Sequence, residues 1–326
     1  MRRRDLIALI LGASVARPVT ARAQQPAKIA RIGFLGLAPA SSWASRLEVL
    51  RSGLRDLGWV EGRNILIEFR WAERTDQLPE LAAKLVRMNV DVIFAVSSTC
   101  VEAARQATQT IPIVFAIHAD PVGLGHVASL ARPGGNITGL SMLLTELAAK
   151  ELEILKEAVP RAARVGVLWN PTTPSHPRAL KAVELAGEKL AVQLHTLPVR
   201  TADDFEGAFA TMTHEGVGAF LSLSGPLEYS ERAPLAGLAL KHRLPGMFGQ
   251  KENVKAGGLM SYSADTLDLV RRSAAYIDRI LKGSSPADLP VEQASKYELA
   301  INLKTAKALD VEFPPIVLVR VDEVIE

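Results

Sequence analysis

The sequence predicts an α/β protein built from two doubly wound parallel sheets, each covered by helices on both faces. Apolar runs of strand length alternate with amphipathic runs of helix length along most of the chain, a pattern typical of parallel sheets with crossover helices. The alternation runs to about residue 142 and begins again at Thr145, which indicates two units of similar layout. The 326 residues suffice for two domains of ordinary size.

Strands of the first unit are recognised by short runs rich in apolar and β-branched residues. They are predicted at 31–37, 64–71, 91–96, 111–117 and 137–141. Helices are predicted at 45–57, 78–88 and 98–108, with a short helical pattern at 122–130. Gly58 ends the first of these helices in a C-cap role. Pro121 interrupts the chain after the fourth strand, since proline excludes a continuous helix there.

The second unit repeats the alternation. Strands are predicted at 164–169, 192–197, 217–223, 246–248, 258–261 and 297–301, with a final extended piece at 316–321. Helices are predicted at 178–190, 202–212, 227–242, 265–281 and 303–309, and one from an N-cap at Thr145 to about Val159. The long amphipathic helix at 265–281 is stopped by Lys282 and Gly283.

The N-terminus has the three parts of an export signal in the right order. A basic start is followed by the apolar run 6–16, and Ala21-Arg22-Ala23 forms a small-residue cleavage site. The pair Arg3-Arg4 also fits a twin-arginine signal. The 11-residue apolar run is too short to span a bilayer, which needs about 20 residues. We therefore expect residues 1–23 to be an export signal, and the mature protein to lie in the periplasm.

Charge and cysteine content exclude several classes of function. Five arginines and one aspartate give residues 1–23 a net charge of +4, so the remainder carries −1 of the chain's +3. This leaves no electrostatic case for binding nucleic acid. The single cysteine, Cys100, excludes an internal disulfide and a cysteine-rich metal site. It lies in the first turn of a predicted helix, where it is either a reactive thiol or a small buried side chain.

Small polar residues follow the predicted strands, and ligands of doubly wound sheets bind beyond the carboxyl ends of strands. Hydroxyl and amide groups there would orient a small polar ligand through hydrogen bonds. The candidate ligand-binding residues are Ser41, Ser97, Ser98, Thr99, His118, Asp120, Trp169, Asn170, Ser175, Ser224 and Tyr262. No residue is expected to be catalytic or to bind a metal.

Two of these groups have competing interpretations. Ser97 to Thr99 form either a plain helix cap or a ligand contact, in which case the free N–H groups of that helix would hold a carboxylate. His118 and Asp120 form either a catalytic dyad or metal pair, or a polar loop beside the cleft, which we favour because no nucleophile motif accompanies them. The glycine fingerprint of dinucleotide sites is absent after the first strand, so no cofactor is expected.

Several strings resemble a known family, the ABC-transporter substrate-binding proteins that include tryptophan- and tyrosine-binding members. They are GWVEGRN at 58–64 with IEFRWAE at 67–73, DPVGLGHVASLARPGGNITGLS at 120–141, AGGLMSY at 256–262 and INLKTAKAL at 301–309. The resemblance covers nearly the whole chain after the signal. It implies the type I periplasmic-binding-protein fold, in which three crossovers join two lobes.

On this resemblance we expect lobe I at 30–142 plus 264–290, and lobe II at 143–263 plus 291–326. It implies a monomeric receptor that closes over a small amino or carboxylic acid, aromatic acids included, and docks transiently on an inner-membrane permease. Three alternatives remain: a sensory receptor for a membrane chemoreceptor or kinase, an exported enzyme using His118 and Asp120, and a transcription regulator of the same fold. The export signal and the missing helix-turn-helix oppose the last.

Overall fold

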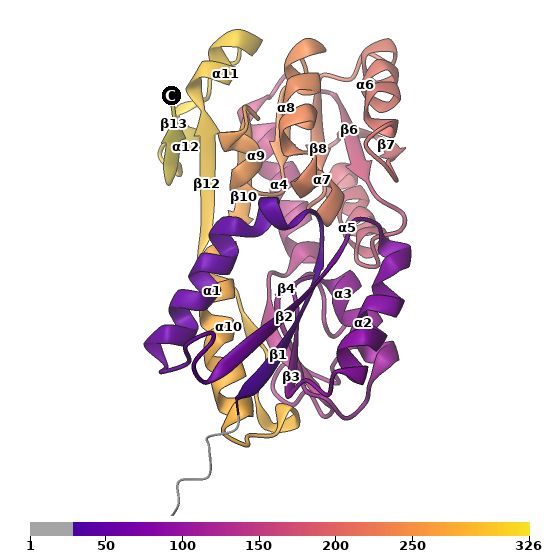
Figure 1. Cartoon of the computed structure of the whole chain (residues 1–326). Coiled ribbons are helices and arrows are strands. Elements are labelled where there is room, and N and C mark those ends of the chain that lie inside the picture. Colours follow the sequence, from indigo (N-terminus) through magenta and orange to yellow (C-terminus); the bar gives the residue numbers. More distant parts are fainter. Residues whose placement is uncertain (1–28) are drawn as a thin grey trace, which may run out of the picture.

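The computed structural model of the protein describes residues 29–326, so the expected export signal at 1–23 lies outside the described residues. Two α/β units are stacked end to end, the first at the bottom of the view and the second at the top (Figure 1). Each unit is built on its own sheet. The prediction of two doubly wound sheets in an α/β fold is thereby confirmed.

The first sheet has six parallel strands in the order β11-β5-β4-β3-β1-β2. Their bounds are β1 (Ala30–Leu37), β2 (Ile65–Ala72), β3 (Val92–Ala95), β4 (Ile113–His118), β5 (Ile137–Ser141) and β11 (Glu292–Gln293). Phe34 of β1 is in register with Phe69 and Phe94 on its two neighbouring strands, and the three rings are in contact. This aromatic row joins the three strands at the β2 edge of the sheet.

Four helices cover the first sheet: α1 (Ala44–Asp56), α2 (Leu78–Arg87), α3 (Ser98–Ala107) and α10 (Thr266–Leu281). Helix α10 lies beside α1 on one face, although more than 200 residues separate them, and α2 lies beside α3 on the other (Figure 1). Gly53 of α1 allows the close approach, because a Cβ there would lie 2.9 Å from the carbonyl oxygen of Arg271. The first unit is therefore complete only when α10 has packed.

The second sheet has seven strands in the order β13-β12-β10-β9-β8-β6-β7. Their bounds are β6 (Arg164–Trp169), β7 (Gln193–Pro198), β8 (Ala219–Ser222), β9 (Gly246–Phe248), β10 (Met260–Ala264), β12 (Tyr297–Asn302) and β13 (Glu323–Ile325). Strands β10 and β12 pair antiparallel, and the other pairs are parallel. The antiparallel strand arises because the chain returns to this sheet after completing the first one.

Eight helices belong to the second unit. They are α4 (Leu144–Ala158), α5 (His176–Lys189), α6 (Asp204–His214), α7 (Pro226–Ser230), α8 (Arg232–Lys241), α9 (Lys251–Lys255), α11 (Leu303–Leu309) and α12 (Pro315–Leu318). Helices α4 and α5 pack together on one face of the sheet, while α8 contacts α6 and α9 on the other. We call the first sheet with its four helices the first lobe, and the second sheet with its eight the second lobe.

The chain crosses between the lobes after β5, after β10 and after β11. We expected the chain to return to the second lobe at residue 291, but Glu292 and Gln293 pair with β5 in the first sheet. Two contacts hold this segment to α10: Tyr276 donates its hydroxyl hydrogen to the carbonyl oxygen of Pro290, and Arg272 pairs with Glu292. The last crossing therefore lies beyond Gln293.

The helical pattern at 122–130 is wrong, because the structure has only turns there. Asp120 Oδ1 accepts a hydrogen bond from the N–H of Gly123 at 2.7 Å, a contact of the kind that begins a helix, but the chain does not continue as one. Gly125 then has a φ of +68°, in the left-handed region that glycine favours. Two glycines in a five-residue span thus convert an apparent helical period into consecutive turns.

Other differences are local. The expected helix at 227–242 is divided into α7 and α8 at Glu231, and the expected extended piece at 316–321 contains the short helix α12. Helix α9 was not expected. The helix assigned to an N-cap at Thr145 instead begins after Leu143, whose φ is +55°.

Candidate functional site

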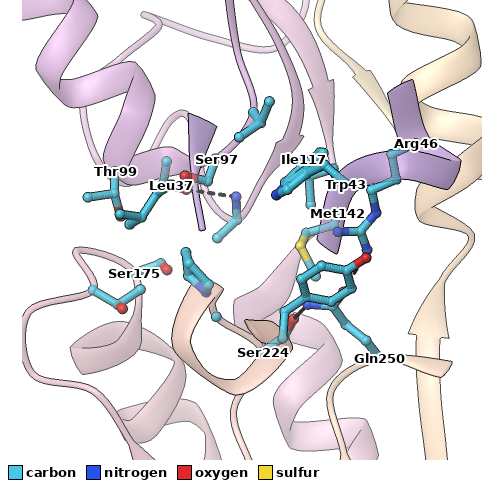
Figure 2. A pocket seen from close by; sticks show the side chains of 17 residues that line it. Leu37, Trp43, Arg46, Ser97, Thr99, Ile117, Met142, Ser175, Ser224 and Gln250 are labelled. Carbon is cyan, nitrogen blue, oxygen red and sulfur yellow. Dashed lines mark hydrogen bonds between the residues drawn. The ribbon is translucent and has the colours of Figure 1, made fainter. Parts of the chain in front are cut away.

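A cavity lies between the two lobes and contains about 540 Å³ of space between protein atoms, including its opening to solvent. It is found at the carboxyl ends of β1, β3 and β4 in the first lobe and of β6, β8 and β9 in the second, where doubly wound sheets place ligands. Figure 2 shows side chains of both lobes facing one another across it. The lining residues are Leu37, Trp43, Arg46, Val96, Ser97, Ser98, Thr99, Ile117, Ala119, Met142, Thr173, Ser175, Ser224, Gly225, Pro226, Tyr229 and Gln250.

The first turn of α3 forms part of the cavity wall. Ser97 is its N-cap, and its hydroxyl oxygen accepts a hydrogen bond from the N–H of Cys100. The N–H groups of Ser98 and Thr99 have no intrahelical acceptor, because they lie in the first turn. The two interpretations of this stretch are therefore compatible: it caps a helix and also lines the cavity. Cys100 is fully buried, and burial raises the pKa of its thiol to about 11, which makes it an inert core residue.

Arg46 is the one charged side chain in the lining. It is only 2% exposed, and its guanidinium lies over the ring of Tyr229 from the second lobe at 3.9 Å and over Trp43 at 4.9 Å. Its Nη2 donates to Gln250 at 2.8 Å and to Thr266 at 3.0 Å, and lies 3.3 Å from Glu252. Arg46 therefore connects the two lobes directly beside the cavity.

Sequence reasoning missed Arg46, Trp43 and Tyr229. Their positions carry a weak signal: Trp43 and Arg46 follow the loop after the first strand, where ligands of such sheets bind. Nothing in the sequence pairs Arg46 with Tyr229, because their contact depends on how the lobes meet.

His118 does not line the cavity but stands behind Ser98. It is fully buried, and its Nδ1 lies 3.3 Å from the Ser98 hydroxyl and accepts a hydrogen bond from the N–H of Asp120. Its Nε2 lies 2.7 Å from Nδ1 of His126, whose Nε2 lies 2.7 Å from the carboxylate of Glu102. Hydrogen bonds, chiefly from Arg105, lower the pKa of Glu102 to about 2, so this carboxylate is ionised and accepts from His126.

Burial lowers the pKa of His118 well below its usual value, with a further contribution from His126, so both rings are neutral near pH 7. The only consistent tautomers place each proton on Nε2, pointing toward Glu102. This chain of hydrogen bonds fixes the orientation of Ser98 at the cavity wall. It is a positioning network, and His118 has no contact with the cavity through which it would meet a ligand.

Asp120 forms a contact between the lobes. Its Oδ2 lies 3.1 Å from Nε of Arg178, the second-lobe residue whose Nη1 also donates to the carbonyl oxygen of Gly123 at 2.9 Å. The hydroxyl of Tyr229 makes a further contact between the lobes, since it donates a hydrogen bond to the carbonyl oxygen of Ser42 at 2.8 Å. The lobes are thus held together on both sides of the cavity.

On the second-lobe side, Ser175 and Ser224 line the cavity and His176 stands behind them. Nδ1 of His176 accepts a hydrogen bond from the N–H of Asn170 at 2.8 Å, so the ring donates from Nε2 to the carbonyl oxygen of Ser224 at 3.0 Å. Burial lowers the pKa of His176 to about 4, which keeps the ring neutral. The hydroxyl oxygen of Ser224 also accepts a hydrogen bond from Gln250.

A buried carboxylate, Glu228, lies next to this wall. Both of its oxygens lack a hydrogen-bond partner, and a Cβ on Gly225 would lie 2.4 Å from Oε2. Glycine at position 225 therefore leaves room for Glu228 behind the cavity wall. Burial raises the pKa of Glu228 to about 8.

Of the candidates predicted from the sequence, the structure brings Ser97, Ser98, Thr99, Ser175 and Ser224 together at the cavity. The others lie outside its lining. Ser41 is exposed, Asn170 closes a turn by accepting from Thr172, and Tyr262 stacks on Tyr297. Trp169 packs against the core, and its Nε1 has no partner.

Within residues 29–326, no helix is both long and apolar enough to cross a membrane. The same residues contain no cluster of three or more histidine, cysteine or acidic side chains placed to hold a metal ion.

Several known proteins are similar to this chain in sequence or in structure. A tyrosine-binding protein of Clostridioides difficile (strain R20291) is 28% identical over 260 residues, which cover 79% of this chain and 74% of that protein. A conserved domain protein of Vibrio cholerae has a similar structure, with a TM-score of 0.86 and 26% identity over 91% of this chain and all of that one. An ABC domain from Streptococcus pneumonia in complex with L-Trp has a TM-score of 0.81 and 24% identity, over 90% of this chain and all of that one.

The family model described as ABC transporter substrate binding protein matches residues 41–325, which include all of the cavity lining except Leu37. The match therefore extends over both lobes and over nearly all of the cavity between them. The chain belongs to the family of ABC transporter substrate-binding proteins.

Proposed function

We propose that this protein is a periplasmic receptor that captures a small amino or carboxylic acid in the cavity between its lobes and delivers it to the permease of an ABC importer. The observation that carries the proposal is the cavity itself, because its wall is shared between two lobes that only three chain crossings connect. The names of the relatives support the ligand class: one is a tyrosine-binding protein, and another was crystallised with L-Trp.

Capture follows from hinge closure. A ligand that contacts both lobes favours the closed arrangement by its differential affinity for it. The contacts of Arg46 with Gln250, Tyr229 with Ser42 and Arg178 with Asp120 join the lobes in the same arrangement. The ligand and these contacts therefore stabilise the same state, and the closed form is the one presented to the permease.

The sequence supports the remaining parts of the proposal. Residues 1–23 have the order of an export signal, and the remainder carries a net charge close to zero. We propose that the mature protein acts as a monomer and that its site residues hold the ligand without making or breaking a covalent bond. Each lobe would move as a rigid body during closure.

Isothermal titration calorimetry against amino acids and aromatic acids, paired with small-angle X-ray scattering, tests the proposal. We expect heat on adding at least one of these acids, together with a scattering envelope that contracts relative to the free protein. Absence of heat across the panel would remove the ligand class. A free protein whose envelope shows no gap between the lobes under any condition would remove hinge closure.

A further inference from the structure

The cavity lining carries positive but no negative charge, and this difference limits which ligands it can bind. Its lining contains one cationic side chain, Arg46, and no aspartate or glutamate. Nη2 of Arg46 makes all of the hydrogen bonds described for this side chain, while Nε is buried without a partner. An unpartnered guanidinium N–H at 2% exposure is costly unless an acceptor reaches it.

The lining contains three further donors. Nε1 of Trp43 is buried without a partner, and Trp43 is 5% exposed in the cavity lining. Opposite it, the first turn of α3 presents the N–H groups of Ser98 and Thr99 at the positive end of a helix dipole. The unsatisfied groups of the lining named here are therefore donors, and an anion with several acceptor lone pairs would satisfy them.

The lining offers no binding position for a cationic group such as an ammonium. Aromatic faces often hold a ligand ammonium, but the guanidinium of Arg46 already lies over the Trp43 and Tyr229 rings, and Arg232 lies 5.0 Å from the Tyr229 ring. An ammonium group there would also be repelled by these guanidinium charges.

The nearest carboxylates do not offer an alternative. Glu252 is 3.3 Å from Arg46 and forms an ion pair with it, and Asp120 pairs with Arg178. Glu228 stands behind Gly225, and burial raises the pKa of its carboxyl group to about 8, so this group is mostly protonated at neutral pH. None of the three provides a free negative charge for an ammonium.

The rest of the lining is apolar. Leu37, Val96, Ile117, Met142 and Pro226 contribute hydrocarbon or thioether surface around the donors. Such a surface accommodates an uncharged aromatic or branched body and gains from excluding water.

We propose that the cavity selects an organic acid in which a single carboxylate is attached to an apolar body that bears no ammonium group. The proposal rests on the receptor function proposed above and narrows its substrate class. The carboxylate is placed among Arg46, Trp43 and the first turn of α3, and the apolar body lies against the hydrocarbon wall. Zwitterionic amino acids are then the poorer ligands, because their ammonium groups lose hydration without gaining a partner.

The test is calorimetric titration of the purified protein at pH 7 with two matched sets of probes. The first is 3-phenylpropionate, L-phenylalanine and 2-phenylethylamine, and the second is indole-3-propionate, L-tryptophan and tryptamine. In at least one set we expect the acid to bind about tenfold or more tightly than the amino acid, and the amine to give no heat. An amino acid that binds as tightly as its matching acid overturns the proposal.

Three variants locate the effect. Arg46→Gln should weaken binding of the acid about tenfold or more, since a charged hydrogen bond is lost. Arg51→Gln, on the same helix but paired with Glu61 outside the cavity lining, is the matched control. Because Arg46 also joins the lobes, Trp43→Phe provides a separate test. It removes the Nε1 donor, keeps a smaller aromatic ring beside Arg46, and should weaken acid binding several-fold. Equal acid affinity in Trp43→Phe and the original protein would contradict the placement of the carboxylate.

Glu228→Gln separates the two substrate classes. If Glu228 held a ligand ammonium, this variant would lose amino-acid binding, whereas we expect the preference for the acid to be unchanged. Failure of this proposal is distinct from failure of the receptor function. Amino acids that bind and contract the scattering envelope would refute the acid preference and keep the receptor, and silence of all six probes would refute both.

Discussion

At the residue scale, Glu228 shows how burial changes a side chain in this protein. Its carboxyl group is 3% exposed and neither oxygen has a hydrogen-bond partner. Burial therefore raises its pKa from 4.5 to about 8. The folded protein holds a proton at Glu228 over a pH range in which the unfolded chain has released it.

This proton makes stability depend on pH. Because the pKa is higher in the folded state, the contribution of Glu228 is fully present below pH 4.5 and is lost as the pH rises toward about 8. Glu228→Gln removes the titration while keeping the shape. We expect the free energy of unfolding of Glu228→Gln, relative to the original protein, to rise by up to about 1.4 kcal/mol per pH unit across this window.

Urea unfolding followed by circular dichroism at pH 5, 6.5 and 8 would measure this difference. Glu61→Gln is a control, because Glu61 is exposed and pairs with Arg51 at the surface. A stability difference between Glu228→Gln and the original protein that stays constant with pH would contradict the raised pKa.

Residues of the site were only partly accessible to sequence reasoning. Ser97 to Thr99, Ser175 and Ser224 follow predicted strands, so the general position of ligands in doubly wound sheets was enough to find them. Arg46 and Tyr229 could not be found in this way. They meet across the lobe boundary, and their roles depend on the three-dimensional closure rather than on any local pattern.

At the element scale, α10 is the segment on which the first lobe depends most. It begins immediately after a crossing from the second lobe, and Asp265 is its N-cap. The Asp265 carboxylate accepts hydrogen bonds from the N–H groups of Leu267 at 3.1 Å and Asp268 at 3.0 Å. The cap therefore fixes where the chain turns from strand β10 into the helix of the other lobe.

Asp265→Ala removes this cap. We expect a loss of about 1 kcal/mol and a fall of about 2–4 °C in Tm, because two N–H groups lose their acceptor. Asp265→Asn keeps a capping oxygen and is expected to remain within about 0.5 kcal/mol of the original protein. Differential scanning calorimetry would measure both variants. If Asn lowered Tm as far as Ala, the negative charge would be responsible and not the cap.

Apolar periodicity in the sequence predicted most of the helices and strands. The differences from the structure can be traced to particular residues or to the order of the chain. Apolar periodicity wrongly predicted a helix at 122–130, because Gly125 adopts a left-handed conformation that a helix does not allow. The order of strands within the second sheet was not predictable, since β12 joins it only after the chain has visited the first sheet. Such returns leave no local signal.

At the scale of the whole molecule, the arrangement of the lobes depends on a few contacts at their boundary. One is the pair of Arg178 with Asp120, in which the Arg178 side chain is 56% exposed. Exposed ion pairs contribute about 0–1 kcal/mol, so under the proposed hinge closure this pair would adjust the balance between open and closed forms without determining it.

Arg178→Ala should therefore shift the free protein toward the open form. We expect ligand affinity to fall by up to about fivefold, with Tm unchanged, because the contact exists only in the closed state. Calorimetric titration and X-ray scattering would measure affinity and compactness. Lys241→Ala removes an ion pair with Glu206 inside the second lobe and serves as the control. An equal loss of affinity in Lys241→Ala would show that the boundary contact is not the cause.

The three crossings have a consequence for biosynthesis. The ribosome produces β1 to β5 first, but the helix that shields one side of this sheet is encoded more than 120 residues after β5 ends. Until α10 emerges, the nascent chain exposes an apolar sheet surface that no neighbouring segment can cover. The first lobe therefore cannot complete its native packing until nearly the whole chain has been synthesised.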